Sequence, residues 1–104
     1  MELKEKTVKD FIVYYRNEKE FDRICKEIFV NEEYRFESKE ESPYIIDCGS
    51  HIGLSILYFK YLYSKAKILG FEPNFENYKI LQKNIKRNNL TGVKVINTAL
   101  SNRA

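Results

Sequence analysis

The sequence predicts an α/β fold in which short apolar strands alternate with amphipathic helices. Residues 44–48 and 67–71 are apolar runs with almost no polar alternation, as in strands that are covered on both faces. Each run is followed by a segment with apolar residues at helical spacing. A third run at residues 93–97 completes the order β-α-β-α-β, which favours a parallel sheet with right-handed crossovers.

Two amphipathic segments precede this unit. Apolar residues recur at i, i+3, i+4 and i+7 in residues 8–15, behind Thr7 as a candidate N-cap, and the same spacing returns in residues 21–28. The spacing predicts two helices, or one helix broken near Asn17.

A short strand and a linker are expected next. Tyr34 and Phe36 alternate with charged residues, which predicts a half-buried strand. Residues 37–43 are rich in charge and end in Pro43, which favours an extended entry into the next element. Residues 1–43 are therefore predicted to be a helical N-terminal extension followed by a charged linker.

The helices between the three apolar runs can also be placed. Leucine, isoleucine and aromatic residues give residues 54–63 a broad apolar face. Residues 75–88 carry a narrower apolar stripe, and Asn74 is a good N-cap for that helix. Residues 90–92 form a turn before the third strand.

Length and composition fit one domain or part of one. The chain has 104 residues, of which 43% are hydrophobic, with eight Tyr and seven Phe, so a globular core is expected. The net charge of +3 divides into −3 over residues 1–41 (12 acids, 9 bases) and +6 over residues 42–104 (3 acids, 9 bases). The bases of the second part are spread over predicted helical surfaces, so we expect solvated faces and no nucleic-acid site.

The cysteines and the N-terminus indicate the compartment. Cys25 and Cys48 lie within apolar patterns and are predicted to be reduced, buried thiols. The sequence contains no 18-residue apolar run and no signal peptide at its charged start. We therefore expect a cytoplasmic protein with no membrane partner, and we predict no metal site.

The turn after the first apolar run is a candidate ligand site. In Asp47-x-Gly49-x-x-Gly53, Gly49 permits a positive φ and leaves room for a ligand, and Gly53 lets the helix pack closely on its strand. Loop N–H groups and the helix N-terminus would favour a negatively charged group. Gly-x-x-Gly turns also join many strands and helices without any binding role.

Glu72, at the end of the second predicted strand, sharpens this hypothesis. A carboxylate at that place can accept hydrogen bonds from two ribose hydroxyls, as the corresponding acid does in dinucleotide-binding folds. The alternative is a surface acid that caps the following helix. A dinucleotide site would usually carry glycine where Asp47 stands. A carboxylate there would repel a pyrophosphate but could hold an ammonium, which favours a cofactor with an amino-acid end.

Residues 44–101 resemble the N-terminal half of class I S-adenosylmethionine-dependent methyltransferases, specifically the FkbM-like family. Four stretches carry the resemblance, in the same order and at compatible spacing: Ile46-Asp47-Cys48-Gly49-Ser50-His51-Ile52-Gly53, Gly70-Phe71-Glu72-Pro73-Asn74, Leu81-Gln82-Lys83-Asn84-Ile85-Lys86-Arg87-Asn88 and Asn97-Thr98-Ala99-Leu100-Ser101. The resemblance implies a Rossmann-like parallel sheet, with residues 44–104 as the truncated N-terminal half of the cofactor-binding domain.

The resemblance also implies a site and an activity. The glycine loop would hold the methionine end of S-adenosyl-L-methionine, Glu72 its ribose, and backbone near residues 98–100 would lie beside the adenine. The implied cofactor-binding residues are Asp47, Gly49, Ser50, His51, Gly53, Glu72, Pro73 and Ala99. The expected reaction is transfer of a methyl group to a hydroxyl of a small molecule or sugar.

One position departs from the family pattern. Ser50-His51 stand where the family more often has Ala-Asn. His51 is the only histidine; cofactor contact is its leading interpretation, ahead of a loop residue without a direct role and of a general base.

The family's fourth strand, with the catalytic and substrate-contacting groups, is expected beyond Ala104. The 104-residue chain alone is therefore expected to be inactive and to bind the cofactor poorly. Its catalytic residues and oligomeric state stay unassigned. A non-catalytic nucleotide-binding module, a truncated inactive gene product and an NAD-linked half-domain are the alternatives.

Overall fold

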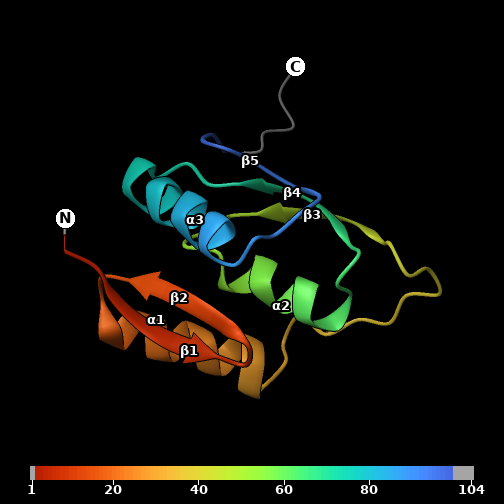
Figure 1. Cartoon of the computed structure of the whole chain (residues 1–104), viewed down its shortest axis with the longest axis horizontal. Helices are drawn as coiled ribbons and strands as arrows, with labels where there is room; N and C mark the ends of the chain where they lie inside the picture. Colours follow the sequence, from red (N-terminus) through yellow and green to blue (C-terminus); the bar gives the residue numbers. More distant parts are fainter. Residues whose placement is uncertain (1, 100–104) are drawn as a thin grey trace.

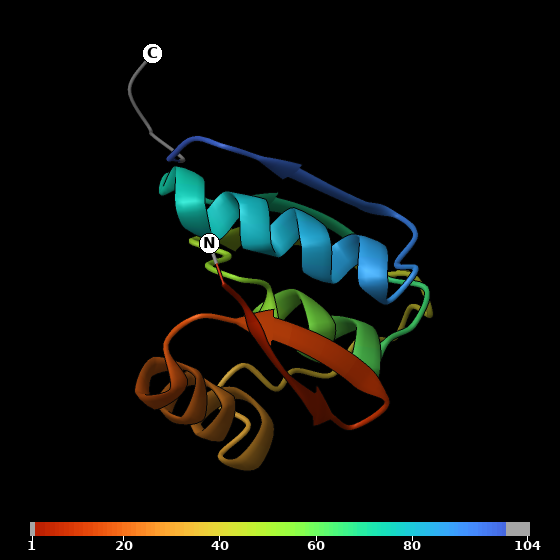
Figure 2. The same ribbon diagram turned by 60° about the vertical axis from the view of Figure 1, so that its left-hand side comes forward.

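The computed structural model describes residues 2–99, which form three layers (Figures 1 and 2). A three-stranded sheet makes the first layer, two helices make the second, and a β-hairpin with a further helix makes the third. Both helices of the middle layer lie on the same face of the sheet (Figure 1).

The sheet is parallel, as the sequence predicts. Its strands β3 (Tyr44–Cys48), β4 (Lys67–Phe71) and β5 (Val93–Ile96) lie in the order β3-β4-β5. Each strand is joined to the next by one helix, which gives the predicted β-α-β-α-β order and confirms the Rossmann-like α/β prediction. Within residues 2–99, β3 pairs only with β4 and is an edge strand.

The two crossover helices differ in character. α2 (Leu54–Leu62) is buried along nearly its whole length between the sheet and the third layer. α3 (Phe75–Arg87) is amphipathic and starts at Asn74, whose side chain accepts a hydrogen bond from the Asn77 N–H, as predicted. The core gathers around these helices, where Ile56, Leu57, Ile80 and Leu81 are at most 1% exposed.

The prediction of a helix over residues 8–15 is wrong. The chain forms an antiparallel hairpin there, β1 (Lys4–Val8) and β2 (Phe11–Tyr15), with a two-residue turn in which Lys9 adopts a φ of 54°. Residues 11–15 are all β-branched or aromatic, a composition that favours strands. The hairpin buries this stretch differently from the predicted helix: Val13 and Tyr15 are at most 3% exposed, whereas Val8, Phe11 and Ile12 are half-buried.

The second predicted N-terminal helix is confirmed. α1 (Glu18–Cys25) begins after Asn17, whose side chain accepts from the Glu20 N–H, and it continues into a π-helical turn, η1 (Lys26–Val30). Asn17 is therefore an N-cap, and it separates the hairpin from the helix.

The prediction of a strand at Tyr34 and Phe36 is wrong, and no strand of residues 2–99 lies beside them to share a hydrogen-bond ladder. Both rings instead pack against Phe59 of α2, with ring centroids 6.2 and 6.0 Å away. The backbone is held by Tyr63, whose hydroxyl accepts from the Ser38 N–H at 2.7 Å. This segment covers the outer side of α2 without forming regular structure.

On the opposite face of the sheet, the edge strand β3 exposes apolar side chains. Side chains alternate along β3, so Tyr44, Ile46 and Cys48 point away from the helices, and Tyr44 and Ile46 are 67% and 55% exposed. Cys48 is exposed and Cys25 half-buried, so the prediction of two buried thiols is wrong for Cys48. No helix within residues 2–99 has the length and apolar character needed to cross a membrane.

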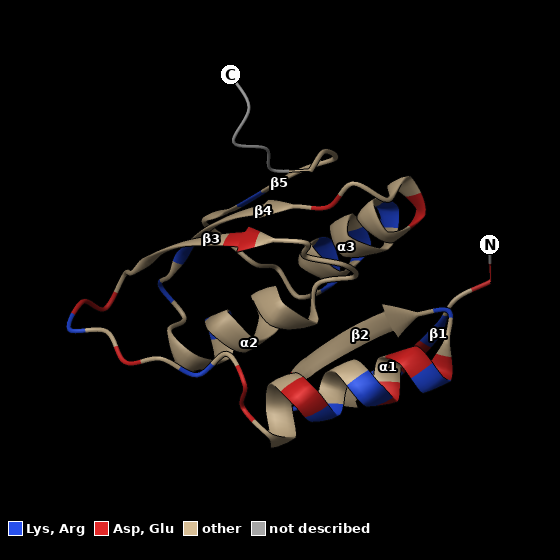
Figure 3. Ribbon diagram, turned by 180° about the vertical axis from the view of Figure 1, so that it is seen from behind, with Lys and Arg blue, Asp and Glu red and all other residues tan. Residues whose placement is uncertain are grey.

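Lys and Arg residues are distributed over several elements (Figure 3). On α1 they alternate with acidic residues, and on α3 they lie along the side that faces solvent.

Candidate functional site

The parallel register brings the carboxyl ends of β3 and β4 together. Asp47 is paired with Gly70 and Cys48 with Phe71, so the loop after Cys48 starts beside Glu72. The N–H groups of Gly49 and Ser50 both donate to the Phe71 carbonyl at 2.8 Å. The predicted glycine loop and the predicted strand-end acid are thus neighbours.

The two glycines of the loop have different physical roles. Gly49 has a φ of +78°, and a Cβ placed on it would meet no heavy atom of residues 2–99 within 4 Å, so this turn has an open side in the described part of the chain. Gly53 has a φ of +108°, and a Cβ on it would lie 2.9 Å from Leu81 Cδ1. The close packing expected at Gly53 is therefore present, but the element it meets is α3 rather than its own strand.

Asp47 lies under the loop and is 9% exposed. Its Oδ2 accepts a 2.6 Å hydrogen bond from the Ser55 hydroxyl, and the Ser50 hydroxyl donates to its backbone carbonyl at 3.3 Å. Ser50 is itself buried and packs against Gly70, where an added Cβ would lie 2.5 Å from Ser50 Oγ.

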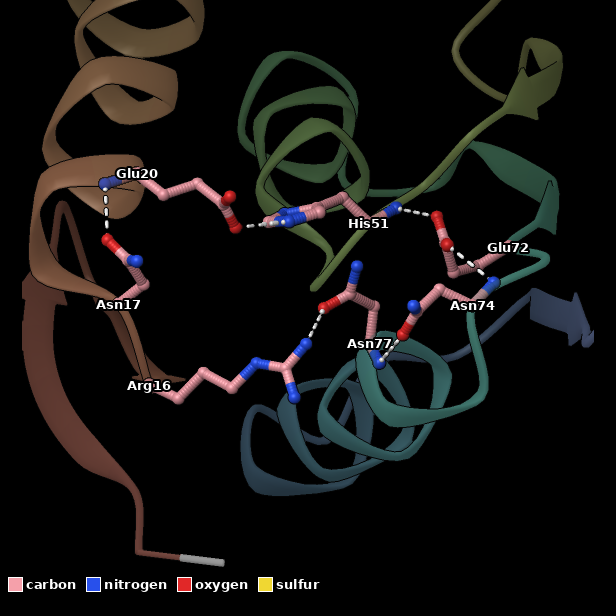
Figure 4. Close-up of polar contacts among 7 residues, drawn as sticks. All are labelled: Arg16, Asn17, Glu20, His51, Glu72, Asn74 and Asn77. Carbon is pink, nitrogen blue, oxygen red and sulfur yellow. Dashed lines mark hydrogen bonds and ion pairs between the residues drawn. The ribbon is translucent and has the colours of Figure 1, made fainter.

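Glu72 is buried, with 5% of its surface exposed, and is not the surface acid of the alternative interpretation. Its Oε1 accepts from the His51 N–H at 2.7 Å, and its Oε2 accepts from the Asn74 N–H at 2.9 Å (Figure 4). Each carboxylate oxygen has two lone pairs, so two backbone bonds fix the plane of the group and leave further acceptor capacity.

His51 joins the loop to the third layer (Figure 4). Its φ is 54°, and its Nε2 lies 2.7 Å from Glu20 Oε1 of α1. Asn and His adopt this left-handed region more readily than most residues, which explains how His51 can stand where the family more often has Asn.

The remaining predicted site residues lie along the same edge of the sheet, at the carboxyl ends of its strands. Pro73 directly follows Glu72, and the Asn97 side chain donates to the carbonyls of Glu72 and Pro73 at 2.9 and 3.1 Å. Ala99 follows β5 and is exposed. Leu100 and Ser101 of the fourth matching stretch lie outside the described residues.

A cavity of about 120 Å³ adjoins the loop on the side that faces α1 and η1. Its lining includes Ile24, Glu27, Ile28, Gly49, His51 and Ser55.

Two contributors to this site, Ser55 and Glu20, were missed from the sequence, and Asn97 was named only within the fourth matching stretch, without a role. Ser55 is a polar residue at the start of an otherwise apolar helix, so it left a local signal. Glu20 lies 31 residues before His51 in the sequence and left no local signal, because its position beside His51 depends on how α1 docks.

The fold and this edge define a class: an α/β unit with a glycine loop and an acidic strand end, as in Rossmann-like nucleotide-binding domains. No model of a protein family matches the sequence. The chain is 41% identical to methyltransferase sdnD of Sordaria araneosa over 97 residues, which are 91% of this chain and 38% of that protein. It is 35% identical over 86 residues to methyltransferase 1 of Beauveria bassiana, covering 81% of this chain and 34% of the relative.

The chain is thus related in sequence to methyltransferases, and it spans a little over a third of the length of these relatives. Solved structures agree on the fold. TYW2 of M. jannaschii in complex with AdoMet superposes with a TM-score of 0.64 at 16% identity, over 90% of this chain and 42% of that one. Methyltransferase FkbM of Methylobacillus flagellatus gives 0.52 at 22% identity, over 60% of this chain and 18% of that one.

Proposed function

We propose that this chain carries one wall of an S-adenosylmethionine site and is part of a methyltransferase of the FkbM-like type. The observation that supports this most directly is the buried Glu72 carboxylate beside the open turn at Gly49. The methyltransferase relatives, and the AdoMet complex of a protein with the same fold, support the same cofactor.

The residues present fit this cofactor. The open side of Gly49 leaves room for a ligand against the backbone, and Glu72 keeps acceptor capacity for ribose hydroxyls. Asp47 is placed under the loop as the candidate partner of an ammonium, with Ser55 holding one of its oxygens. When bound, S-adenosylmethionine supplies a methyl group on a positively charged sulfur for displacement by a nucleophile.

The proposed acceptor is a hydroxyl of a small molecule or sugar. Gly49, Ser50, His51 and Gly53 would hold the methionine end, and Pro73 and Ala99 would lie toward the adenine. We propose that the chain alone binds weakly and transfers no methyl group, because its relatives are more than twice as long. Measured turnover by the chain alone would contradict this.

Ligand titration followed by NMR tests the cofactor. S-adenosylhomocysteine is expected to shift the amide signals of Gly49, His51 and Glu72, and NAD at equal concentration is expected to leave them in place. Shifts with NAD alone would favour the oxidoreductase half-domain. If the chain binds a nucleotide tightly and no methyl group is transferred even when a partner chain is added, the non-catalytic module would be favoured.

A matched pair of variants locates the site. Glu72→Gln keeps the volume but replaces one accepting oxygen with an NH₂ group, so affinity for S-adenosylhomocysteine is expected to fall about tenfold or more. Glu76→Gln removes a half-buried acid that pairs with Lys79 in the first turn of α3, and it is expected to leave affinity unchanged. Equal affinities of the two variants would count against a ribose contact at Glu72.

A further inference from the structure

We propose that Glu20 is a positioning residue of this site: its carboxylate holds the His51 ring and thereby fixes the loop conformation that aims the His51 N–H at Glu72. This inference rests on the proposed function and extends the site to α1. Glu20 belongs to the third layer, outside the strand–loop–helix unit that carries the other site residues.

Two hydrogen bonds connect the two carboxylates through His51, and a third holds Glu72 from its other side (Figure 4). Glu20 Oε1 meets His51 Nε2 at 2.7 Å, the His51 N–H donates to Glu72 Oε1 at 2.7 Å, and Glu72 Oε2 accepts from the Asn74 N–H at 2.9 Å. His51 therefore contacts Glu20 through its ring and Glu72 through its backbone. A change at the ring is transmitted to Glu72 through one residue.

The His51 ring needs its contact with Glu20 because the backbone of His51 lies in the left-handed region. A φ of 54° is less stable than ordinary backbone for any residue with a Cβ. A carboxylate accepts only, so the nitrogen that meets Glu20 carries the proton. The other nitrogen, Nδ1, is buried and has no hydrogen-bond partner among the described residues, so within residues 2–99 Glu20 is the polar anchor of the ring.

The residues before Glu20 also bind α3 and cap α1. Arg16 Nη2 donates to Asn77 Oδ1 in the first turn of α3 at 3.2 Å. Between Arg16 and Glu20, Asn17 caps α1 by accepting from the Glu20 N–H. Residues 16–20 thus bridge the glycine loop and the start of α3, the two elements that flank Glu72 (Figure 4).

Three variants test the proposal. Glu20→Ala removes the acceptor. Glu20→Gln keeps a carbonyl oxygen that can accept from Nε2–H. Glu18→Ala is the matched control, because it removes a carboxylate from the same first turn of α1, where its partner is Lys6 rather than the loop.

Two readouts need no ligand. Because His51 is the only histidine, its ring ¹⁵N shifts report the tautomer without assignment ambiguity. Hydrogen exchange of the His51 amide reports its bond to Glu72. The third readout is the dissociation constant for S-adenosylhomocysteine, measured by NMR titration of each chain.

Glu20→Ala is expected to shift the His51 Nε2 signal because its acceptor is lost, to speed exchange of the His51 amide at least about fivefold, and to weaken S-adenosylhomocysteine binding about five- to tenfold. Glu20→Gln is expected to restore most of each property, and Glu18→Ala to change none. An unchanged Nε2 signal, exchange rate and affinity in Glu20→Ala would overturn the proposal. If S-adenosylhomocysteine shifts no signal of the unchanged chain, the proposed function fails, and the Nε2 signal and exchange data still decide the role of Glu20.

Discussion

The Asn84 side chain of α3 pairs with both backbone groups of Tyr14 in β2. Its Oδ1 accepts from the Tyr14 N–H at 2.7 Å, and its Nδ2 donates to the Tyr14 carbonyl at 3.1 Å. One turn later, Asn88 pairs in the same way with the N–H and carbonyl of Ile12, both at 2.9 Å. Asn84 within α3 and Asn88 at its C-cap thus satisfy alternate residues along the free edge of the hairpin, which holds the hairpin and α1 over the site.

Replacing Asn84 with alanine is expected to lower the free energy of unfolding by about 2–4 kcal/mol, because backbone groups of Tyr14 and Ile52 lose their buried partner. Chemical denaturation of the variant and of the unchanged chain measures this difference in the free energy of unfolding. Lys83→Ala, an exposed change on the same helix, is the control and is expected to stay within about 0.5 kcal/mol. Equal stabilities of the two variants would contradict the structural role of Asn84.

Gly70→Ala is expected to destabilise the chain by about 1–3 kcal/mol, because the new methyl group would lie 2.5 Å from Ser50 Oγ. Ser50→Ala removes that oxygen, so the double variant is expected to recover part of the loss. Contacts of 3.1 and 3.2 Å with Ile56 and Val95 would remain. Denaturation of both single variants and the double variant gives the coupling energy, and strictly additive effects would show that Ser50 is not the obstacle.

His51→Asn is expected to keep S-adenosylhomocysteine affinity within about threefold, because Asn adopts a positive φ readily and needs less help from Glu20. His51→Val is the contrasting variant, since a β-branched residue is strongly disfavoured at that φ, and it is expected to lose most of the affinity. Complete loss of binding in His51→Asn would show that the imidazole itself is required.

The two thiols are expected to react at different rates. Burial, with a further contribution from Asp22, raises the pKa of Cys25, so less thiolate is present at a given pH than for an ordinary cysteine. Cys48 is exposed. Iodoacetamide at pH 8 is expected to modify Cys48 at least about tenfold faster, as measured by mass spectrometry of peptides. In denaturant the two rates should converge, and equal rates in the folded chain would contradict this assignment.

The parallel unit was predictable because its signals are local. The unbroken apolar runs before Cys48 and Phe71 and the N-cap at Asn74 each lie inside the element that they specify. The hairpin was not predictable from the helical spacing, since the residues that the two strands bury most are Val13 and Tyr15, and only Tyr15 belongs to that spacing. The glycine loop and Glu72 follow from the sequence, whereas the docking of α1 depends on contacts such as Glu20–His51 that only the folded chain creates.

The hydrogen bonds from the hairpin to α3 also have a kinetic consequence. They join residues 70 and 76 positions apart, whereas each strand of the parallel unit pairs with the next one along the chain. Closing the longer loops costs more chain entropy before any contact is gained. We expect the sheet and its helices to form first and the hairpin to dock afterwards, so Asn84→Ala should mainly speed unfolding and leave the folding rate nearly unchanged. Stopped-flow kinetics would refute this order if the variant slowed folding instead.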